Sequence, residues 1–172
     1  HAGLDVTVVE MAEHIIAPLD SDMASLVQHY ARENGINLIL KNGVQALTPT
    51  KSHIEVQLNH GSVNADLVLM SVGVKPETSI AQKAGISCNS RGAILVDEHM
   101  RTSTPDIYAV GDAIAVTNFV TKQEAYIPLA GPANKQGRIA ADHICGRNVS
   151  FNGTQGTSVL KLFDMTVATT GI

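Results

Sequence analysis

The pattern of hydrophobic and polar positions predicts that the chain opens with two strands joined by a helix. Val6–Glu10 is a β-branched run, VTVVE, of the kind that forms a strand buried on both faces. Ile36–Leu40 has the same apolar character and predicts a second strand. Because the first strand starts so close to His1, the chain is expected to be a piece of a longer fold.

The segment between these strands has helical periodicity from about Asp22 to Glu33. Asp20 or Ser21 can cap its start, and Gly35 ends it. Its apolar residues are expected to share one face: Met23, Leu26, Val27 and Tyr30.

The next stretch predicts a small antiparallel sheet followed by one more strand. Three short segments have strand character, and the last two are joined as a hairpin by the turn NHGS: Gly43–Leu47, His53–Leu58 and Ser62–Ala65. Leu67–Met70 is fully apolar and predicts a strand that leads into SVGVKP, Ser71–Pro76. Strand, helix, strand, meander and strand is the order of a nucleotide-binding α/β half with a β insertion.

The remainder predicts a second unit. A short helix is expected near Thr78–Ala84, followed by strands at Ala93–Val96 and Ile107–Val110. A longer helix should run from about Pro132, at its first position, to Cys145, with Gly146 marking its end. A linker rich in Gly, Ser, Thr and Asn then leads to two last strands: Val159–Phe163 and a segment near Thr166–Thr169.

Composition excludes several functional classes. The 172 residues are 44% hydrophobic with a net charge of −4, so no basic field favours nucleic acid or an anionic membrane surface. No apolar run reaches the roughly 18 residues that span a bilayer, and we expect a cytoplasmic protein. Cys88 and Cys145 form no CxxC pair, and the seven histidines lack zinc-ligand spacing, so we expect reduced thiols and no metal.

The segment TSTPDIYAVGDA, Thr102–Ala113, is the strongest local motif. An apolar strand ends at Gly111, where the missing side chain allows a ligand to approach the backbone. Asp112 then offers a carboxylate at the carboxyl end of the strand, where α/β folds bind ligands. The segment resembles the second FAD-binding motif of flavoproteins with two dinucleotide-binding domains, which implies that Asp112 contacts the ribityl and pyrophosphate region of FAD.

A second motif is IPLAGPANKQGR, Ile127–Arg138. The first amides of the helix that starts here have no internal partners, so they and the amides of Leu129 and Ala130 can face an electron-rich group. The segment resembles the flavin-facing helix of the coenzyme A disulfide reductase and NADH oxidase branch. That resemblance implies that Asn134 also approaches FAD.

Two further positions point to NAD. Glu10 ends the first strand, where an acidic residue accepts hydrogen bonds from the adenosine ribose hydroxyls. Met11–His14 contain no Arg or Lys to neutralise a 2′-phosphate, which favours NADH over NADPH. Gly73, in a turn that resembles the family's crossing from the NAD to the FAD domain, would allow a dinucleotide backbone to approach closely.

Together these motifs resemble the latter part of an FAD-dependent pyridine nucleotide-disulfide oxidoreductase. The resemblance implies a partial α/β, Rossmann-like fold with two dinucleotide-binding domains, a β-meander insertion and the first strands of an α+β dimerisation domain. The implied domains are the latter part of the NAD(P)-binding domain at 1–73, the latter part of the FAD-binding domain at 74–146, and a linker with the start of the dimerisation domain at 147–172.

The resemblance also implies a function. Members of this family pass electrons from NAD(P)H through FAD to a disulfide, a coenzyme A disulfide, a persulfide or oxygen, and they are homodimers. Their active-site cysteine is expected upstream of His1, so no catalytic residue is assigned within the chain. Two alternatives stay open: a flavoprotein reductase for ferredoxin, rubredoxin or nitrite reductase, and a non-catalytic scaffold fragment.

Overall fold

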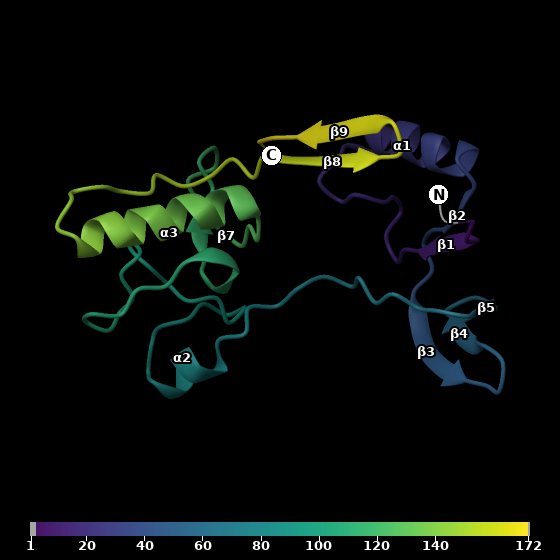
Figure 1. Cartoon of the computed structure of the whole chain (residues 1–172), viewed down its shortest axis with the longest axis horizontal. Helices are drawn as coiled ribbons and strands as arrows, with labels where there is room; N and C mark the ends of the chain where they lie inside the picture. Colours follow the sequence, from purple (N-terminus) through teal and green to yellow (C-terminus); the bar gives the residue numbers. More distant parts are fainter. Residues whose placement is uncertain (1–2, 172) are drawn as a thin grey trace. The chain divides into compact units, whose positions relative to one another are not determined.

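The computed structural model describes residues 3–171, which form two compact units. One unit comprises the chain up to Val72 together with Val159–Val167. The other comprises Gly73–Ser158 and the chain from Ala168. Figure 1 labels most of the helices and strands of the two units.

The first unit contains the predicted strand, helix and strand. Strand β1 (Val6–Val9) pairs in parallel with β2 (Ile36–Ile39), and α1 (Ser21–Glu33) connects them. The prediction that the first strand is buried on both faces is wrong for this chain, because Val6 and Val8 are 41% and 38% exposed. Within the described residues β1 pairs only with β2, and a two-stranded sheet leaves apolar side chains uncovered.

The buried face of helix α1 agrees with the predicted one only in part, because Val27 is buried and Tyr30 is half-buried but the other two predicted residues are not covered. Met23 and Leu26 are exposed, because the buried positions lie one residue further along the helix: Ala24, Val27, Gln28 and Ala31. This face is covered by the hairpin of β8 (Ser158–Leu162) and β9 (Met165–Thr169), which lies beside α1 in Figure 1. The packed side chains are Leu19, Ala24 and Val27 against Ile15, Ile16, Leu162, Met165 and Val167.

The predicted meander is confirmed. Strands β3 (Val44–Pro49), β4 (Ile54–Leu58) and β5 (Ser62–Ala65) form an antiparallel sheet in chain order. Asn42, which is buried, receives the backbone N–H of His60 on its Oδ1 atom at 3.1 Å and donates from Nδ2 to the His60 carbonyl at 3.0 Å. This pair of bonds fixes the turn between the last two strands.

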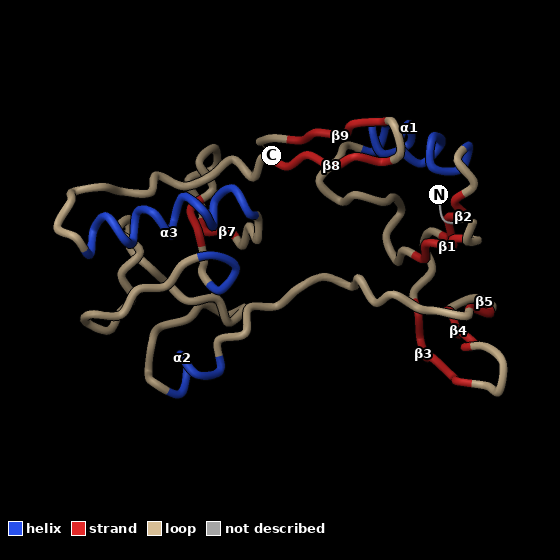
Figure 2. The backbone as a smooth tube through the Cα atoms, viewed as in Figure 1, coloured by secondary structure: helices blue, strands red, loops and turns tan. Residues whose placement is uncertain are grey.

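The predicted strand at Leu67–Met70 is wrong. Figure 2 shows an extended loop after β5, and no strand is assigned between Ala65 and α2 (Ser79–Lys83). Leu69 is 84% exposed. An apolar, β-prone sequence forms a strand only when a neighbouring strand completes its hydrogen bonds, and the described residues supply none here.

The second unit packs its loops around a core cluster of buried side chains: Ala81, Ile86, Ile94, Met100, Ile114, Val116 and Ala140. Its regular elements are α2, the 3-10 turn η1 (Gly111–Ala113), a short pair of strands and α3 (Ala130–Ile144); the strands are β6 (Val116–Thr117) and β7 (Glu124–Ala125). The strands predicted at Ala93–Val96 and Ile107–Val110 appear only as isolated bridges, from Ile94 and from Tyr108.

Helix α3 confirms the predicted helix with a shifted start. It begins at Ala130, so Pro132 is its third residue rather than its first. Its end is as predicted: Gly146 has φ +82° and donates to the His143 carbonyl at 2.9 Å, while Arg147 donates to Asp142 at 3.0 Å. This pair of bonds is the Schellman arrangement, which needs a left-handed residue after the helix.

Among residues 3–171, no helix is both long and apolar enough to cross a membrane. Cys88 and Cys145 are free thiols, as predicted.

Candidate functional site

The turn at Gly111 and Asp112 is joined directly to helix α3. Gly111 has φ +75°, a conformation that side-chain-bearing residues rarely adopt. Its N–H donates to the Oε1 atom of Gln136 at 2.8 Å, and Gln136 is only 1% exposed. The Gly111 amide is therefore satisfied by a buried side chain of the helix.

Asp112 lies in this turn with its side chain exposed. Its carboxylate makes no hydrogen bond or ion pair with another residue in the described part of the chain, whereas its backbone carbonyl accepts from the Tyr126 hydroxyl at 2.9 Å. Burial raises the pKa of Tyr126, and the negative charge of Asp112 raises it further. The Tyr126 hydroxyl is therefore protonated at neutral pH and donates to that carbonyl.

The start of α3 lies against the same turn. A Cβ atom built on Gly111 would be 3.8 Å from the Cβ of Ala133, in ordinary contact. The amides of Ala130 and Gly131 have no partner among residues 3–171. The turn and this helix end together present a free carboxylate and two free N–H groups. The carboxylate can accept hydrogen bonds from ligand hydroxyls, and the N–H groups can donate to an electron-rich edge of the same ligand.

Two other predicted residues of this segment already have partners. The Leu129 N–H donates to the Ile127 carbonyl at 3.0 Å, so this amide is not free to face a ligand as the sequence suggested. The Asn134 side chain is exposed and donates from Nδ2 to the carbonyl of Ala130 at 2.9 Å. Its Oδ1 atom is the part of Asn134 that stays available.

In the first unit, Glu10 follows β1 directly. Its carboxylate accepts the N–H of Ala12 at 2.8 Å, which holds the acid at the carboxyl end of the strand. Nearby, the Lys41 N–H donates to the Ala12 carbonyl, and the Lys41 Nζ atom lies 2.5 Å from Glu13 Oε1. The hydrogen bond and charge of Lys41 lower the pKa of Glu13, so this exposed carboxylate is ionised at neutral pH.

Gly73 is the first residue of the second unit. It is exposed and has φ +91°, and a Cβ atom built on it would have no other atom within 4 Å.

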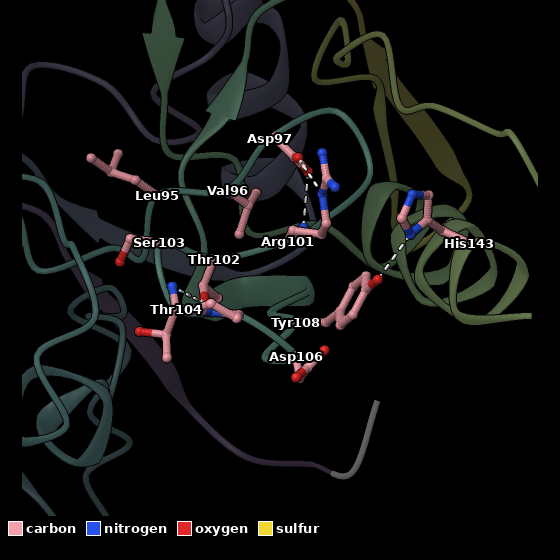
Figure 3. Close-up of a pocket in the computed structure, with 11 residues that line it drawn as sticks. Leu95, Val96, Asp97, Arg101, Thr102, Ser103, Thr104, Asp106, Tyr108 and His143 are labelled. Atoms are coloured by element: carbon pink, nitrogen blue, oxygen red, sulfur yellow. Dashed lines mark hydrogen bonds and ion pairs between the residues drawn. The ribbon is translucent and has the colours of Figure 1, made fainter. Parts of the chain in front are cut away.

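A depression of about 750 Å³ lies elsewhere in the second unit (Figure 3). Its lining combines apolar, hydroxyl and charged side chains and includes Leu95, Asp97, Arg101, Thr102, Tyr108 and His143. None of the residues predicted to bind a cofactor lines it. The predicted site is therefore an open turn and helix end rather than this cavity.

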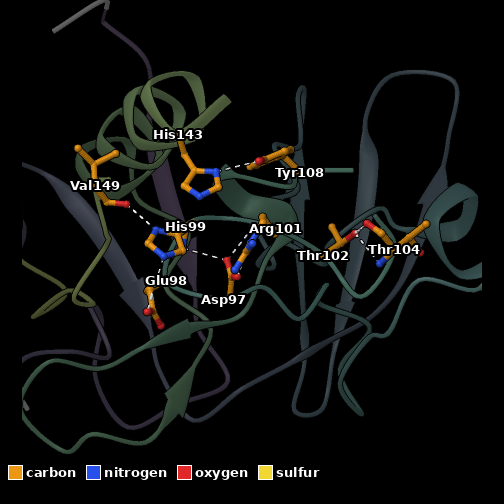
Figure 4. Close-up of polar contacts among 9 residues, drawn as sticks. All are labelled: Asp97, Glu98, His99, Arg101, Thr102, Thr104, Tyr108, His143 and Val149. Atoms are coloured by element: carbon orange, nitrogen blue, oxygen red, sulfur yellow. Dashed lines mark hydrogen bonds and ion pairs between the residues drawn. The ribbon is translucent and has the colours of Figure 1, made fainter. Parts of the chain in front are cut away.

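Polar contacts beside this depression join the end of α3 to the segment that precedes the Gly111–Asp112 turn (Figure 4). The Tyr108 hydroxyl is 2.8 Å from His143 Nδ1, and the His143 ring stacks on His99 with centroids 4.5 Å apart. Burial raises the pKa of Asp97, but hydrogen bonds from Arg101 and from the His99 N–H outweigh it, so this pKa lies below its ordinary value. These contacts brace the segment that leads to Gly111.

Sequence reasoning missed Gln136, Tyr126 and Lys41. Gln136 did carry a signal: it is a polar residue spaced four positions from Pro132 and from Ala140, and all three are buried on α3. The partners of Tyr126 and Lys41 are set by the fold of the loops and leave no such pattern in the sequence.

The chain is similar to one protein family and to several characterised proteins. The family model described as pyridine nucleotide-disulphide oxidoreductase matches residues 1–137. An NADH oxidase of Methanocaldococcus jannaschii is 36% identical over 99% of the chain, and an NAD(P)H sulfur oxidoreductase (CoA-dependent) of Pyrococcus furiosus is 30% identical over 99%. A nitric oxide reductase FlRd-NAD(+) reductase of Shigella flexneri is 36% identical over 86%. The chain spans 38%, 38% and 37% of these relatives.

Solved structures agree with the observed fold. Reduced CoADR-RHD of Bacillus anthracis matches 99% of the chain at 45% identity with a TM-score of 0.93, and the match covers 30% of that protein. The water-forming NADH oxidase of Lactobacillus brevis bound to NADH matches 99% of the chain at 33% identity with a TM-score of 0.93, covering 38% of that protein.

Proposed function

Because the chain belongs to the pyridine nucleotide-disulphide oxidoreductase family, we propose that the protein carrying it moves electrons from NADH through FAD to a small-molecule acceptor. The acceptor is a disulfide, a coenzyme A disulfide, a persulfide or oxygen. Relatives that match nearly the whole chain are named as an NADH oxidase and a CoA-dependent sulfur oxidoreductase, which supports this class of acceptor.

Residues 74–146 form the latter part of the FAD-binding domain in this proposal. Asp112 accepts hydrogen bonds from hydroxyls of the ribityl chain, beside the side-chain-free backbone of Gly111. The start of α3, with the unpartnered N–H groups of Ala130 and Gly131, faces the electron-rich edge of the flavin, with Asn134 one turn further along. Bound FAD would supply a two-electron carrier between NADH and the acceptor.

Residues 1–73 form the latter part of the NAD-binding domain. The carboxylate of Glu10, held at the end of β1 by the Ala12 N–H, accepts from the adenosine ribose hydroxyls. Gly73 allows the dinucleotide to approach the backbone. Lys41 already forms an ion pair with Glu13, which supports NADH rather than NADPH as the donor.

Residues 147–172 form a linker and the start of a dimerisation domain, and the protein is a cytoplasmic homodimer. Val159 in β8 is 67% exposed and Leu160 is 38% exposed, which supports a further packing partner for this hairpin.

One observation carries the proposal: an unpartnered carboxylate at Asp112 stands beside free amides of α3, on a turn tied to that helix through Gln136. The experiment is an anaerobic titration of the purified full-length protein with NADH, followed by flavin absorbance. We expect bound flavin that NADH bleaches and that oxygen, a coenzyme A disulfide or a persulfide restores.

A full-length protein without bound flavin, or with flavin that NADH leaves oxidised, would contradict the proposal. The choice of acceptor is read from the reoxidation step. Reoxidation that requires a rubredoxin or ferredoxin, and is slow with every small molecule, would instead establish a reductase of protein partners, the class of the Shigella flexneri relative.

A further inference from the structure

Gln136 is a polar side chain in a place that packing alone would fill with an apolar one. It is 1% exposed and lies on the same face of α3 as buried Pro132 and Ala140. A buried side-chain amide costs free energy unless it is hydrogen-bonded. Here its oxygen receives the N–H of Gly111 at 2.8 Å, and that contact accounts for a glutamine at this position.

Tyr126 holds the same turn through the backbone carbonyl of Asp112. Its hydroxyl donates to the Asp112 backbone oxygen at 2.9 Å. The N–H of Gly111 and the C=O of Asp112 are thus both engaged by side chains from outside the turn. The carboxylate of Asp112 is left free, and its direction is set by a backbone that is held at two points.

We propose that Gln136 and Tyr126 are positioning residues that hold the Gly111–Asp112 turn in its ligand-binding conformation and thereby set the affinity for FAD. This inference rests on the proposed function, since it concerns the same site. Neither residue needs to touch the cofactor: both act through the turn. Preorganisation of this kind lowers the cost of binding because the turn is already ordered before the ligand arrives.

The test compares FAD affinity in variants of the full-length apoprotein. Gln136→Met keeps most of the side-chain volume and removes the acceptor, and Tyr126→Phe removes only the hydroxyl. We expect each to raise the Kd for FAD about fivefold or more, which corresponds to about 1 kcal/mol. Tyr126→Phe keeps the proposal testable if Gln136→Met fails to fold, because the Tyr126 side chain is only partly buried.

The chain offers a matched control in Gln28→Met. Gln28 is also a buried glutamine on a helix, and its Oε1 atom accepts the N–H of Ile15 at 3.2 Å, but it lies in the first unit. This variant should lower the unfolding temperature to a similar degree and leave the Kd for FAD unchanged. A loss of FAD affinity equal to that of Gln136→Met would show a general effect of destabilisation and overturn the proposal.

A second readout needs no FAD. Amide hydrogen exchange of the apoprotein should be faster at Gly111–Ala113 in Gln136→Met and Tyr126→Phe, and unchanged there in Gln28→Met. Unaltered exchange at the turn, or an unaltered Kd in both site variants, would overturn the positioning role. If the wild-type apoprotein binds no FAD while exchange changes as expected, the proposed function fails and the role of the two residues in ordering the turn stands.

Discussion

The carboxylate of Asp112 is exposed and unpartnered in the described chain, so its removal should cost binding rather than folding. In the full-length protein we expect Asp112→Ala to raise the Kd for FAD by about five- to a hundredfold, because a buried ligand hydroxyl would lose its acceptor at a cost of about 1 to 3 kcal/mol. Titration of the apoprotein measures this change. Asp142→Ala, at the other end of α3, is the control and should leave the Kd unchanged.

For single residues, the sequence predicts best those positions where the local backbone conformation requires one residue type. Gly111 was singled out because it has no side chain, and the structure gives it φ +75°, a conformation that favours glycine, while its approach to a ligand stays a prediction. The partners that fix the turn, Gln136 and Tyr126, could not be predicted, because they lie 25 and 14 residues away from the groups they bind. Such bonds follow from tertiary packing rather than from sequence spacing.

In the proposed NAD site, the choice between NADH and NADPH depends on Glu10. There its carboxylate would accept hydrogen bonds from free ribose hydroxyls but repel a 2′-phosphate, and nearby Lys41 already forms an ion pair with Glu13. We expect the full-length enzyme to prefer NADH by about tenfold or more in kcat/KM, since each factor of ten requires only about 1.4 kcal/mol. Steady-state kinetics with both nucleotides measure this preference.

A double change should narrow or reverse the preference. Glu10→Ala removes the repulsion, and Met11→Arg adds a partner for phosphate. Met11 is 76% exposed, so an arginine fits there without repacking the core. A wild-type enzyme at least as efficient with NADPH would show that Glu10 serves only to hold the Ala12 N–H.

The elements that the sequence predicted well are those whose stability is local. Helix α1, helix α3 and the meander of β3, β4 and β5 each carry their own periodicity, caps or turns. The strands predicted at Leu67–Met70 and Ile107–Val110 are equally apolar, but a strand also needs a neighbour to complete its ladder. Within residues 3–171, Leu67–Met70 has no neighbouring strand, and Ile107–Val110 has only the single bridge between Tyr108 and Arg101.

Two glycines of α3 should respond to alanine with opposite sign. Gly146 lies beyond the helix end at φ +82°, so Gly146→Ala should destabilise the protein by about 1 kcal/mol. Gly137 lies inside the helix with open space around its Cα, so Gly137→Ala should stabilise it by about 0.5 to 1 kcal/mol. Urea unfolding of the two variants beside wild type measures both changes, and the same sign in both would show that α3 does not end as described.

The chain as a whole leaves large apolar side chains in contact with solvent. Leu67, Leu69 and Val72 are 70%, 84% and 81% exposed in the loop after β5, and Val159 is 67% exposed in β8. Apolar segments this exposed indicate surfaces that pack against other protein. The chain spans only 38% of the two relatives that match nearly all of it, so such partners are expected within the longer protein.

Because the chain spans only part of its relatives' length, its function by itself is a separate question. A dinucleotide pyrophosphate is usually held on a glycine-rich loop at a helix start, and these 172 residues contain no GxGxxG sequence. In the proposed FAD site, Asp112 and the amides of α3 would not replace that loop. We therefore expect the chain expressed alone to be colourless after purification and unable to oxidise NADH, whereas the full-length protein should carry flavin. Stoichiometric flavin on the purified chain, seen by its absorbance, would show that these 172 residues are sufficient for FAD binding and would contradict the prediction.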